Sequence, residues 1–148
     1  MALSPVLLLH SGGMSSRQWR RLVEMLAPSH RTFAPDLLGS GANALWPDDQ
    51  PFDLAMDVDA IERIVDDIGE PVHVVGHSYG GLLAVTLARR IPGRIRSLVA
   101  YDPVAFGVLH DANDAEGLAD LARAGNDPTF TDFARGGSDA WFEVFVDY

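Results

Sequence analysis

The sequence predicts an α/β fold in which a parallel sheet carries helices on both faces. Short apolar runs, bounded by glycine and proline, alternate along the chain with longer segments of helical periodicity. The resulting β-α-β-α-β-α-β order implies right-handed crossovers between strands. Such crossovers make the strands parallel and place the helices against the sheet.

The first third of the chain predicts two strands, a helix and a long loop. Residues 6–9 form a continuous apolar run, which is typical of a buried parallel strand. A helix capped by Ser15 or Ser16 follows, because apolar residues then recur at i, i+3, i+4 and i+7: Trp19, Leu22, Val23 and Leu26. Residues 31–35 predict a second strand, and the glycines and prolines of residues 37–52 predict a loop.

The next segments predict two longer helices and two more strands. A helix begins near Asp53 and ends at Gly69, with one apolar stripe: Leu54, Val58, Ile61, Val65 and Ile68. Residues 72–75 predict a third strand, residues 78–91 a helix rich in small residues at its start, and residues 95–101 a fourth strand.

The character of the sequence changes near residue 105. Residues 1–105 form the predicted core domain, and residues 106–148 form a separate region without an evident fifth strand. Residues 112–124 and 138–147 predict two helices in that region. The second helix lies in an aromatic segment that contains Trp141, Phe142, Phe145 and Tyr148.

Composition excludes several classes of function. The chain has 148 residues, of which 47% are hydrophobic and 22% charged, as in ordinary globular domains. Its net charge of −10 opposes binding to nucleic acid and to anionic membrane surfaces. The absence of cysteine excludes disulfides, thiolate metal sites and a cysteine nucleophile. The lack of cysteine fits a cytoplasmic protein, and we expect that location because the first residues predict a strand and not a signal peptide and no apolar stretch is long enough to cross a bilayer.

Residues 76–80, Gly-His-Ser-Tyr-Gly, carry the main chemical signal. They form a G-x-S-x-G pattern between an apolar strand and a helix. On such a sharp turn the backbone of Ser78 is strained and its hydroxyl is exposed, while the flanking glycines let strand and helix approach closely. The alternative is an ordinary strand-to-helix turn in which Ser78 only caps the helix.

Three motifs, in the order in which they occur along the chain, resemble those of the α/β-hydrolase superfamily, in its serine-nucleophile form typified by AB hydrolase-1. Gly76–Gly81 resembles the nucleophile elbow, His10–Gly13 the HG-type oxyanion loop, and Asp36–Gly41 the D-x-x-G-x-G loop. Trp19 also stands where many members have a tryptophan. The resemblance covers residues 5–105 and corresponds to the N-terminal portion of the family's fold.

The resemblance implies roles for individual residues. Ser78 would be the nucleophile, and the backbone N–H groups of Tyr79 and Gly12 would bind the oxyanion that acyl transfer generates. A serine at the elbow opposes dehalogenase or epoxide hydrolase chemistry, for which the resemblance would require a carboxylate. No spacing typical of a metal site occurs among the histidines, and we expect neither metal nor cofactor.

The triad acid and base are harder to assign. In this family the acid and the histidine follow the serine in the chain. Asp102, at the end of the fourth strand, is a candidate acid, because some relatives place theirs there; the alternative is a strand-ending turn without a catalytic role. His110 is the only later histidine and lies in the predicted cap, where a role as base is not expected.

The earlier histidines are poor candidates for the base. His77 adjoins Ser78 on a tight turn and points elsewhere, and in the family the position of His10 is usually structural. His73 lies inside a strand and His30 precedes one. We therefore expect the acid and base to come from residues outside this chain.

The resemblance also implies that the fold is incomplete. The sheet would have four strands in the spatial order second, first, third, fourth, with the start of a helical cap in residues 106–148. An open sheet edge invites association. We therefore expect a truncation, a fragment or one chain of two, with a second chain or a homo-oligomer completing the fold.

Two functions follow as hypotheses. The first is a serine hydrolase that cleaves a small, rather apolar ester-like substrate, such as a carboxylic ester or lactone, through an acyl-enzyme. The second is a non-catalytic module that binds a ligand or pairs through its open edges.

Overall fold

The computed structural model describes residues 3–47 and 49–126. The chain divides into two compact units, residues 1–104 and residues 105–148. The first unit contains the sheet, and the described part of the second contains two helices.

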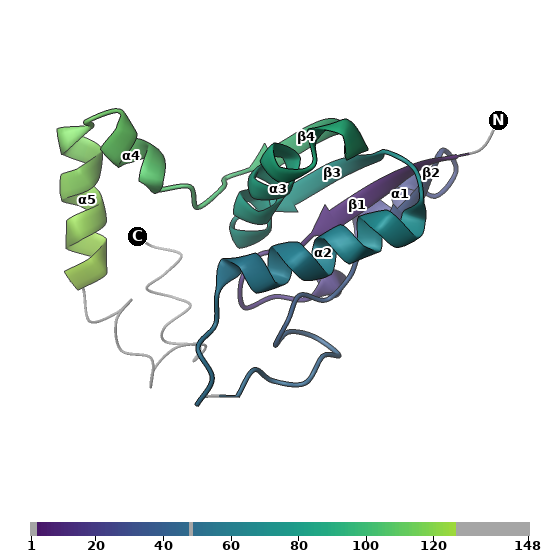
Figure 1. Ribbon diagram of the computed structural model, residues 1–148, viewed down its shortest axis with the longest axis horizontal. Coiled ribbons are helices and arrows are strands. Elements are labelled where there is room, and N and C mark those ends of the chain that lie inside the picture. Colours follow the sequence, from purple (N-terminus) through teal and green to yellow (C-terminus); the bar gives the residue numbers. More distant parts are fainter. Residues whose placement is uncertain (1–2, 48, 127–148) are drawn as a thin grey trace. The chain divides into compact units, whose positions relative to one another are not determined.

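The first unit is built on a four-stranded parallel sheet in the order β2-β1-β3-β4 (Figure 1). The strands are β1 (Ser4–Leu9), β2 (His30–Phe33), β3 (Val72–His77) and β4 (Ile95–Tyr101). The predicted strand order and parallel direction are therefore confirmed. Leu9 pairs with Gly76, so the carboxyl ends of β1 and β3 lie side by side at one edge of the sheet.

Helices α2 (Leu54–Ile68) and α3 (Tyr79–Arg90) cover one face of this sheet. Both helices contribute apolar side chains to one buried cluster with residues of β1 and β3, among them Leu7, Val74, Val65 and Leu87. Side chains along β1 point alternately to the two faces of the sheet. Leu8 is fully buried but lies outside that cluster, so it belongs to the opposite face. The 3-10 turn η1 (Ser16–Trp19) and helix α1 (Arg20–Leu26) contact β1 and β2.

The predicted ends of α2 are confirmed, whereas the predicted cap of the first helix is wrong. Asp53 caps α2 by accepting a hydrogen bond of 2.7 Å from the Ala55 N–H, and Gly69 ends it at φ 77°. At the first helix the side chain of Ser15 makes no capping bond. The carboxylate of Asp36 accepts the free N–H of Ser16 instead, at 2.7 Å. An acid that is distant in the sequence but close in the fold has replaced the expected local cap.

The edge strand β4 leaves apolar side chains uncovered in the described part of the chain. Leu98 is 39% exposed, Val99 53% and Tyr101 67%. Neighbouring positions on a strand point to opposite faces, so the exposure is not limited to one side. Among the described residues this strand ends the sheet, as the resemblance implies.

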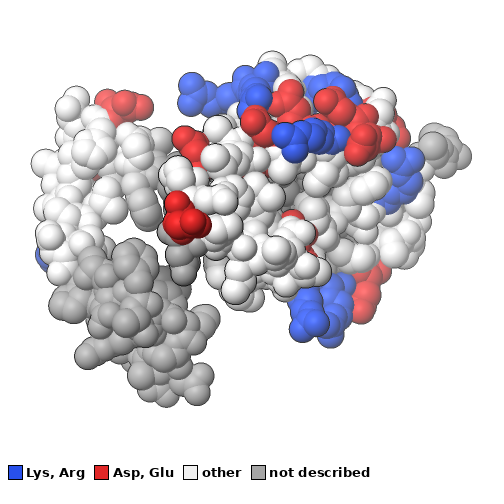
Figure 2. Space-filling view, turned by 60° about the horizontal axis from the view of Figure 1, so that its bottom comes forward, with Lys and Arg blue, Asp and Glu red and all other residues white. Residues whose placement is uncertain are grey.

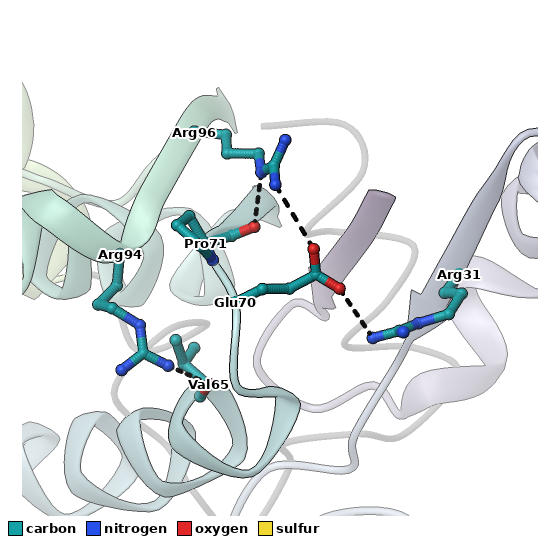
Figure 3. Close-up of polar contacts among 6 residues, drawn as sticks. All are labelled: Arg31, Val65, Glu70, Pro71, Arg94 and Arg96. Carbon is teal, nitrogen blue, oxygen red and sulfur yellow. Dashed lines mark hydrogen bonds and ion pairs between the residues drawn. The ribbon is translucent and has the colours of Figure 1, made fainter. Parts of the chain in front are cut away.

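Charged residues join the strands at their amino ends (Figure 3). Glu70 pairs with Arg31 of β2 and with Arg96 of β4, each at 3.4 Å. Arg94, from the turn η2 (Pro92–Arg94), donates to the carbonyl of Val65 at 2.7 Å. Basic and acidic side chains are likewise intermixed over part of the surface in Figure 2. Exposed pairs of this kind contribute little stability, about 0–1 kcal/mol each.

The second unit differs from the predicted single helix over residues 112–124. It contains α4 (Gly107–Asp111) and α5 (Ala115–Asn126), so the first helix was missed and the second begins three residues late. The break arises because Asn113 takes a positive φ of 52° and the Asp114 side chain caps the Gly117 N–H at 2.9 Å. The helix predicted for residues 138–147 lies outside the described residues.

None of the described helices combines the length and apolar character that crossing a bilayer requires. The cytoplasmic location stays a prediction.

Glycine at position 80 determines how closely α3 approaches β1, which yields a first prediction. A Cβ at Gly80 would collide with the carbonyl oxygens of Leu9 and His10. We expect Gly80→Ala to lower the free energy of unfolding by at least about 2 kcal/mol, measured by urea denaturation. Gly93→Ala is the matched control, because a Cβ there meets nothing within 4 Å. Equal midpoints for both variants would contradict this packing.

Candidate functional site

The turn between β3 and α3 consists of Ser78 alone. Its backbone takes φ 53° and ψ −116°, a conformation that is rare for any residue other than glycine. Its N–H donates to the carbonyl of Tyr101 at 2.9 Å, and its carbonyl accepts from Leu82 at 3.1 Å. The surrounding strands and helix therefore hold the strained residue in place.

The side chain of Ser78 makes no capping hydrogen bond to α3. A capping serine has extended backbone angles and accepts an N–H of the first helical turn. The alternative in which Ser78 serves only as a cap is therefore wrong. The hydroxyl lies at the start of a helix, where the backbone dipole favours developing negative charge.

Gly12 and Tyr79, the expected oxyanion donors, lie against each other. A Cβ built on Gly12 would lie 3.6 Å from the Cβ of Tyr79. Tyr79 is the first residue of α3, so its N–H has no partner within the helix. The structure thus brings together two of the predicted motifs, the HG-type loop that contains Gly12 and the elbow that contains Tyr79.

His10 is structural, as expected. Its side chain is fully buried, its Nε2 accepts the Leu37 N–H at 3.0 Å, and its Nδ1 donates to the Ser11 carbonyl at 2.7 Å. It therefore links the first loop, which is the HG-type loop His10–Gly13, to the D-x-x-G-x-G loop. With both ring nitrogens occupied, it has no lone pair left to act as a base.

The other histidines of the first unit also have structural partners. The Gln18 side chain donates to His77 Nδ1 at 3.1 Å and accepts the Ser11 N–H at 3.0 Å, so it connects the first loop to the elbow. His73 bonds the Ser97 hydroxyl at 2.7 Å, and His30 bonds that of Ser29 at 2.8 Å.

Asp36 organises the D-x-x-G-x-G loop. Its carboxylate accepts the N–H groups of Ser16 at 2.7 Å and Ala42 at 2.9 Å. These hydrogen bonds hold the pKa of Asp36 below its ordinary value, and the bond from Ser16 has the largest effect. Gly41 is required beside it, because its φ is 60° and a Cβ there would collide with the Asp36 carboxylate.

A cavity of about 220 Å³ opens beside these loops. It touches both expected oxyanion residues, Gly12 and Tyr79, and its remaining walls come from the D-x-x-G-x-G loop, the long loop and α2: Leu37, Leu38, Gly39, Ser40, Trp46, Phe52 and Asp57. The walls are mainly apolar, as in many pockets for small molecules. The side chain of Ser78 is not among the lining groups.

Asp57 is the residue that sequence reasoning missed. It is 1% exposed on the buried side of α2. The signal was present in the helical spacing, because position 57 is i+3 from Leu54 and i−4 from Ile61 and so shares their apolar face. An acid at such a position must find hydrogen-bond donors in the fold.

Asp102 follows β4 with φ 46° and is exposed. In the parts of the chain that the structure describes, its carboxylate bonds no histidine. His110 lies in α4 of the second unit. The candidate role of Asp102 as triad acid therefore stays a prediction.

Comparison with known proteins identifies the family. The family described as alpha/beta hydrolase fold matches residues 4–144. The chain belongs to this family. Lipase LipV of Mycobacterium tuberculosis is 39% identical over 99 residues, which are 66% of this chain and 36% of the lipase. A pimeloyl–acyl-carrier protein methyl ester esterase of Neisseria meningitidis is 35% identical over 119 residues, which are 80% of this chain and 43% of the esterase.

Solved structures of the family agree. A meta-cleavage product hydrolase of Pseudomonas fluorescens superposes with a TM-score of 0.61 at 31% identity, covering 68% of this chain and 38% of that one. This chain therefore spans less than half the length of the relatives named here. It corresponds to the N-terminal portion of the family's fold.

The lowered pKa of Asp36 yields a prediction for stability against pH. Because the folded-state pKa is lowered, the carboxylate stabilises the fold above the ordinary carboxyl pKa, and this contribution is lost as pH falls through the lowered value. Asp36→Asn should lower the free energy of unfolding by about 1–3 kcal/mol at neutral pH, since an amide oxygen cannot replace both carboxylate acceptors.

The measurement is urea denaturation of both proteins at neutral pH and at about pH 3, below the ordinary Asp pKa. The difference in free energy of unfolding between the wild-type protein and Asp36→Asn should be smaller at the acid pH. Asp67→Asn, at an exposed position of α2, is the control and should change little at either pH. A difference for Asp36→Asn that is independent of pH would contradict the assignment.

Proposed function

We propose that the protein is a serine hydrolase that cleaves ester-like carbonyl substrates through an acyl-enzyme. The observation that carries the proposal is the strained backbone of Ser78, at φ 53°, with its side chain free of any capping bond. A strained residue that the surrounding fold holds in place, at the end of a strand, supports a functional role. The relatives named as a lipase and a methyl ester esterase support the ester class.

The proposed reaction has two steps. Ser78 Oγ forms a bond to the substrate carbonyl carbon while its proton passes to a base, and the tetrahedral oxyanion is held by the N–H groups of Tyr79 and Gly12. Collapse of this intermediate expels the alcohol, which takes up the proton. Water then attacks the acyl-enzyme, releasing the acid and restoring the Ser78 hydroxyl.

The base would come from residues outside this chain, and so would the orienting acid if it is not Asp102. Four of its histidines have structural partners in the first unit, and the fifth, His110, is not expected to act as the base. Asp102 remains the one candidate acid within the sequence. A second polypeptide or a longer chain would therefore complete the triad.

The cavity supports a small, rather apolar substrate. Trp46 and Phe52 form an edge-to-face pair with ring centroids 5.2 Å apart, and Leu37 and Leu38 add aliphatic surface. Apolar groups gain free energy on entering such surroundings. The acyl or alcohol part of an ester would occupy this space.

The exposed β4 favours a second candidate, a module that pairs through its open edge. Leu98, Val99 and Tyr101 would be covered by a second chain or another copy. Intact-mass analysis and sedimentation of the purified protein, together with its esterase activity, separate the two candidates. A homogeneous, inactive oligomer of the 148-residue chain would favour the module.

The nucleophile is tested by hydrolysis of p-nitrophenyl acetate. In a preparation that carries the complete site, we expect Ser78→Ala to lower kcat/KM more than about 100-fold, because the acyl-enzyme can no longer form. Ser29→Ala, at an exposed position after α1, is the matched control and should retain activity. Equal rates for Ser78→Ala and the wild-type protein would reject the assignment.

A further inference from the structure

Asp57 forms a buried bridge between two segments that line the cavity. Its Oδ1 accepts the backbone N–H of Leu38 at 3.0 Å, and its Oδ2 accepts the Tyr79 hydroxyl at 3.0 Å. The residue is 1% exposed. Each carboxylate oxygen thus has a donor, which offsets the cost of removing the group from water.

The Tyr79 phenol is the donor of its hydrogen bond to Asp57. Asp57 lies in the first turn of α2, where the backbone dipole stabilises negative charge. Burial, the charge of Asp57 and the hydrogen bond to it raise the pKa of the Tyr79 phenol, with burial the largest cause. The phenol therefore stays protonated at neutral pH and donates to a carboxylate.

Tyr79 connects this bridge to the elbow. It follows Ser78 directly and begins α3, and its Cβ lies beside the place that a Cβ of Gly12 would take. Its side chain is anchored at the far end by Asp57, while its backbone N–H is the donor that the proposed reaction needs. A tether on the ring limits the rotation of the residue that carries this N–H.

Leu38 connects the bridge to the other wall of the cavity. Its neighbour Leu37 is bonded to His10, and Asp36 holds the start of the same loop to Ser16. Asp57 is the one described residue whose side chain bonds both this loop and Tyr79. The loop and the elbow are thereby held to one carboxylate.

We propose that Asp57 is a positioning residue for the proposed reaction: it fixes the orientation of the Tyr79 backbone N–H toward the oxyanion and holds the loop at Leu38 against it. The inference rests on the proposed function, which it deepens. Asp57 touches no reacting atom in this account and acts through Tyr79.

Two variants act on the same hydrogen bond from opposite ends. Asp57→Asn keeps the shape of the side chain but replaces the charged acceptor with an amide, which forms only a weaker, neutral bond to the phenol, and Tyr79→Phe keeps the ring but removes the bond. Each should lower kcat for p-nitrophenyl acetate about 10-fold with KM nearly unchanged, because the loss appears in the transition state. The double variant should be little worse than either single one.

Asp59→Asn is the matched control. Asp59 lies on the same helix, where its exposed carboxylate pairs with Arg90 on the surface. It should leave kcat and KM unchanged. Urea denaturation of every variant checks that the chains are folded under the assay conditions.

A second readout does not depend on activity. The NMR order parameter of the backbone amide at position 79 should be near the rigid value of about 0.85 in the wild-type protein and in Asp59→Asn. It should fall clearly in Asp57→Asn and Tyr79→Phe. An amide that stays rigid in both variants, or a loss of activity seen only in KM, would overturn the proposal.

The two proposals fail in different ways. If the wild-type protein cleaves no ester, the proposed function fails, whereas the order parameter still decides whether Asp57 holds the amide at position 79. If the wild-type protein is active and both variants retain full kcat, the role of Asp57 is wrong while the nucleophile assignment stands.

Discussion

The site depends on the direct contact between the start of α3 and the carboxyl end of β1. Gly80 has no room for a side chain beside the carbonyls of Leu9 and His10, and Gly76 has none beside Gly80. This contact forces the chain to turn within one residue, so Ser78 takes its strained conformation. Strain of this kind costs about 1–3 kcal/mol and persists only where the surrounding structure enforces it. Here the hydrogen bonds of the Ser78 backbone to Tyr101 and Leu82 do so.

Buried and half-buried polar groups connect the loops around this turn. His10 joins the first loop to the D-x-x-G-x-G loop, Gln18 joins the first loop to His77, and Asp57 joins the D-x-x-G-x-G loop to Tyr79. Each link spans segments that are distant in sequence. Because a half-satisfied buried group is costly, such links favour a single arrangement of the loops over alternatives. The positions of Gly12 and Tyr79 are therefore a property of the network rather than of either loop alone.

Local patterns in the sequence were sufficient for the strands, α2 with both ends, and the elbow at Ser78, whereas the order of the strands in the sheet came from the family resemblance. They failed where a distant group replaces a local one. Asp36 supplies the cap expected from Ser15 or Ser16, and the break between α4 and α5 depends on the side chain of Asp114 and the positive φ of Asn113. Asp57 was missed because its charge obscured a position on the apolar face, and its partners Leu38 and Tyr79 become neighbours only in the folded chain.

The most direct test of the account is to locate the nucleophile chemically. The protein, with whatever polypeptide supplies the base, is treated with a fluorophosphonate, and the modified residue is identified by peptide mass spectrometry. We expect one phosphonyl group on Ser78, formed in step with the loss of esterase activity, because the reagent requires an activated serine hydroxyl. Complete loss of activity with Ser78 unmodified, or with the label on another residue, would contradict it.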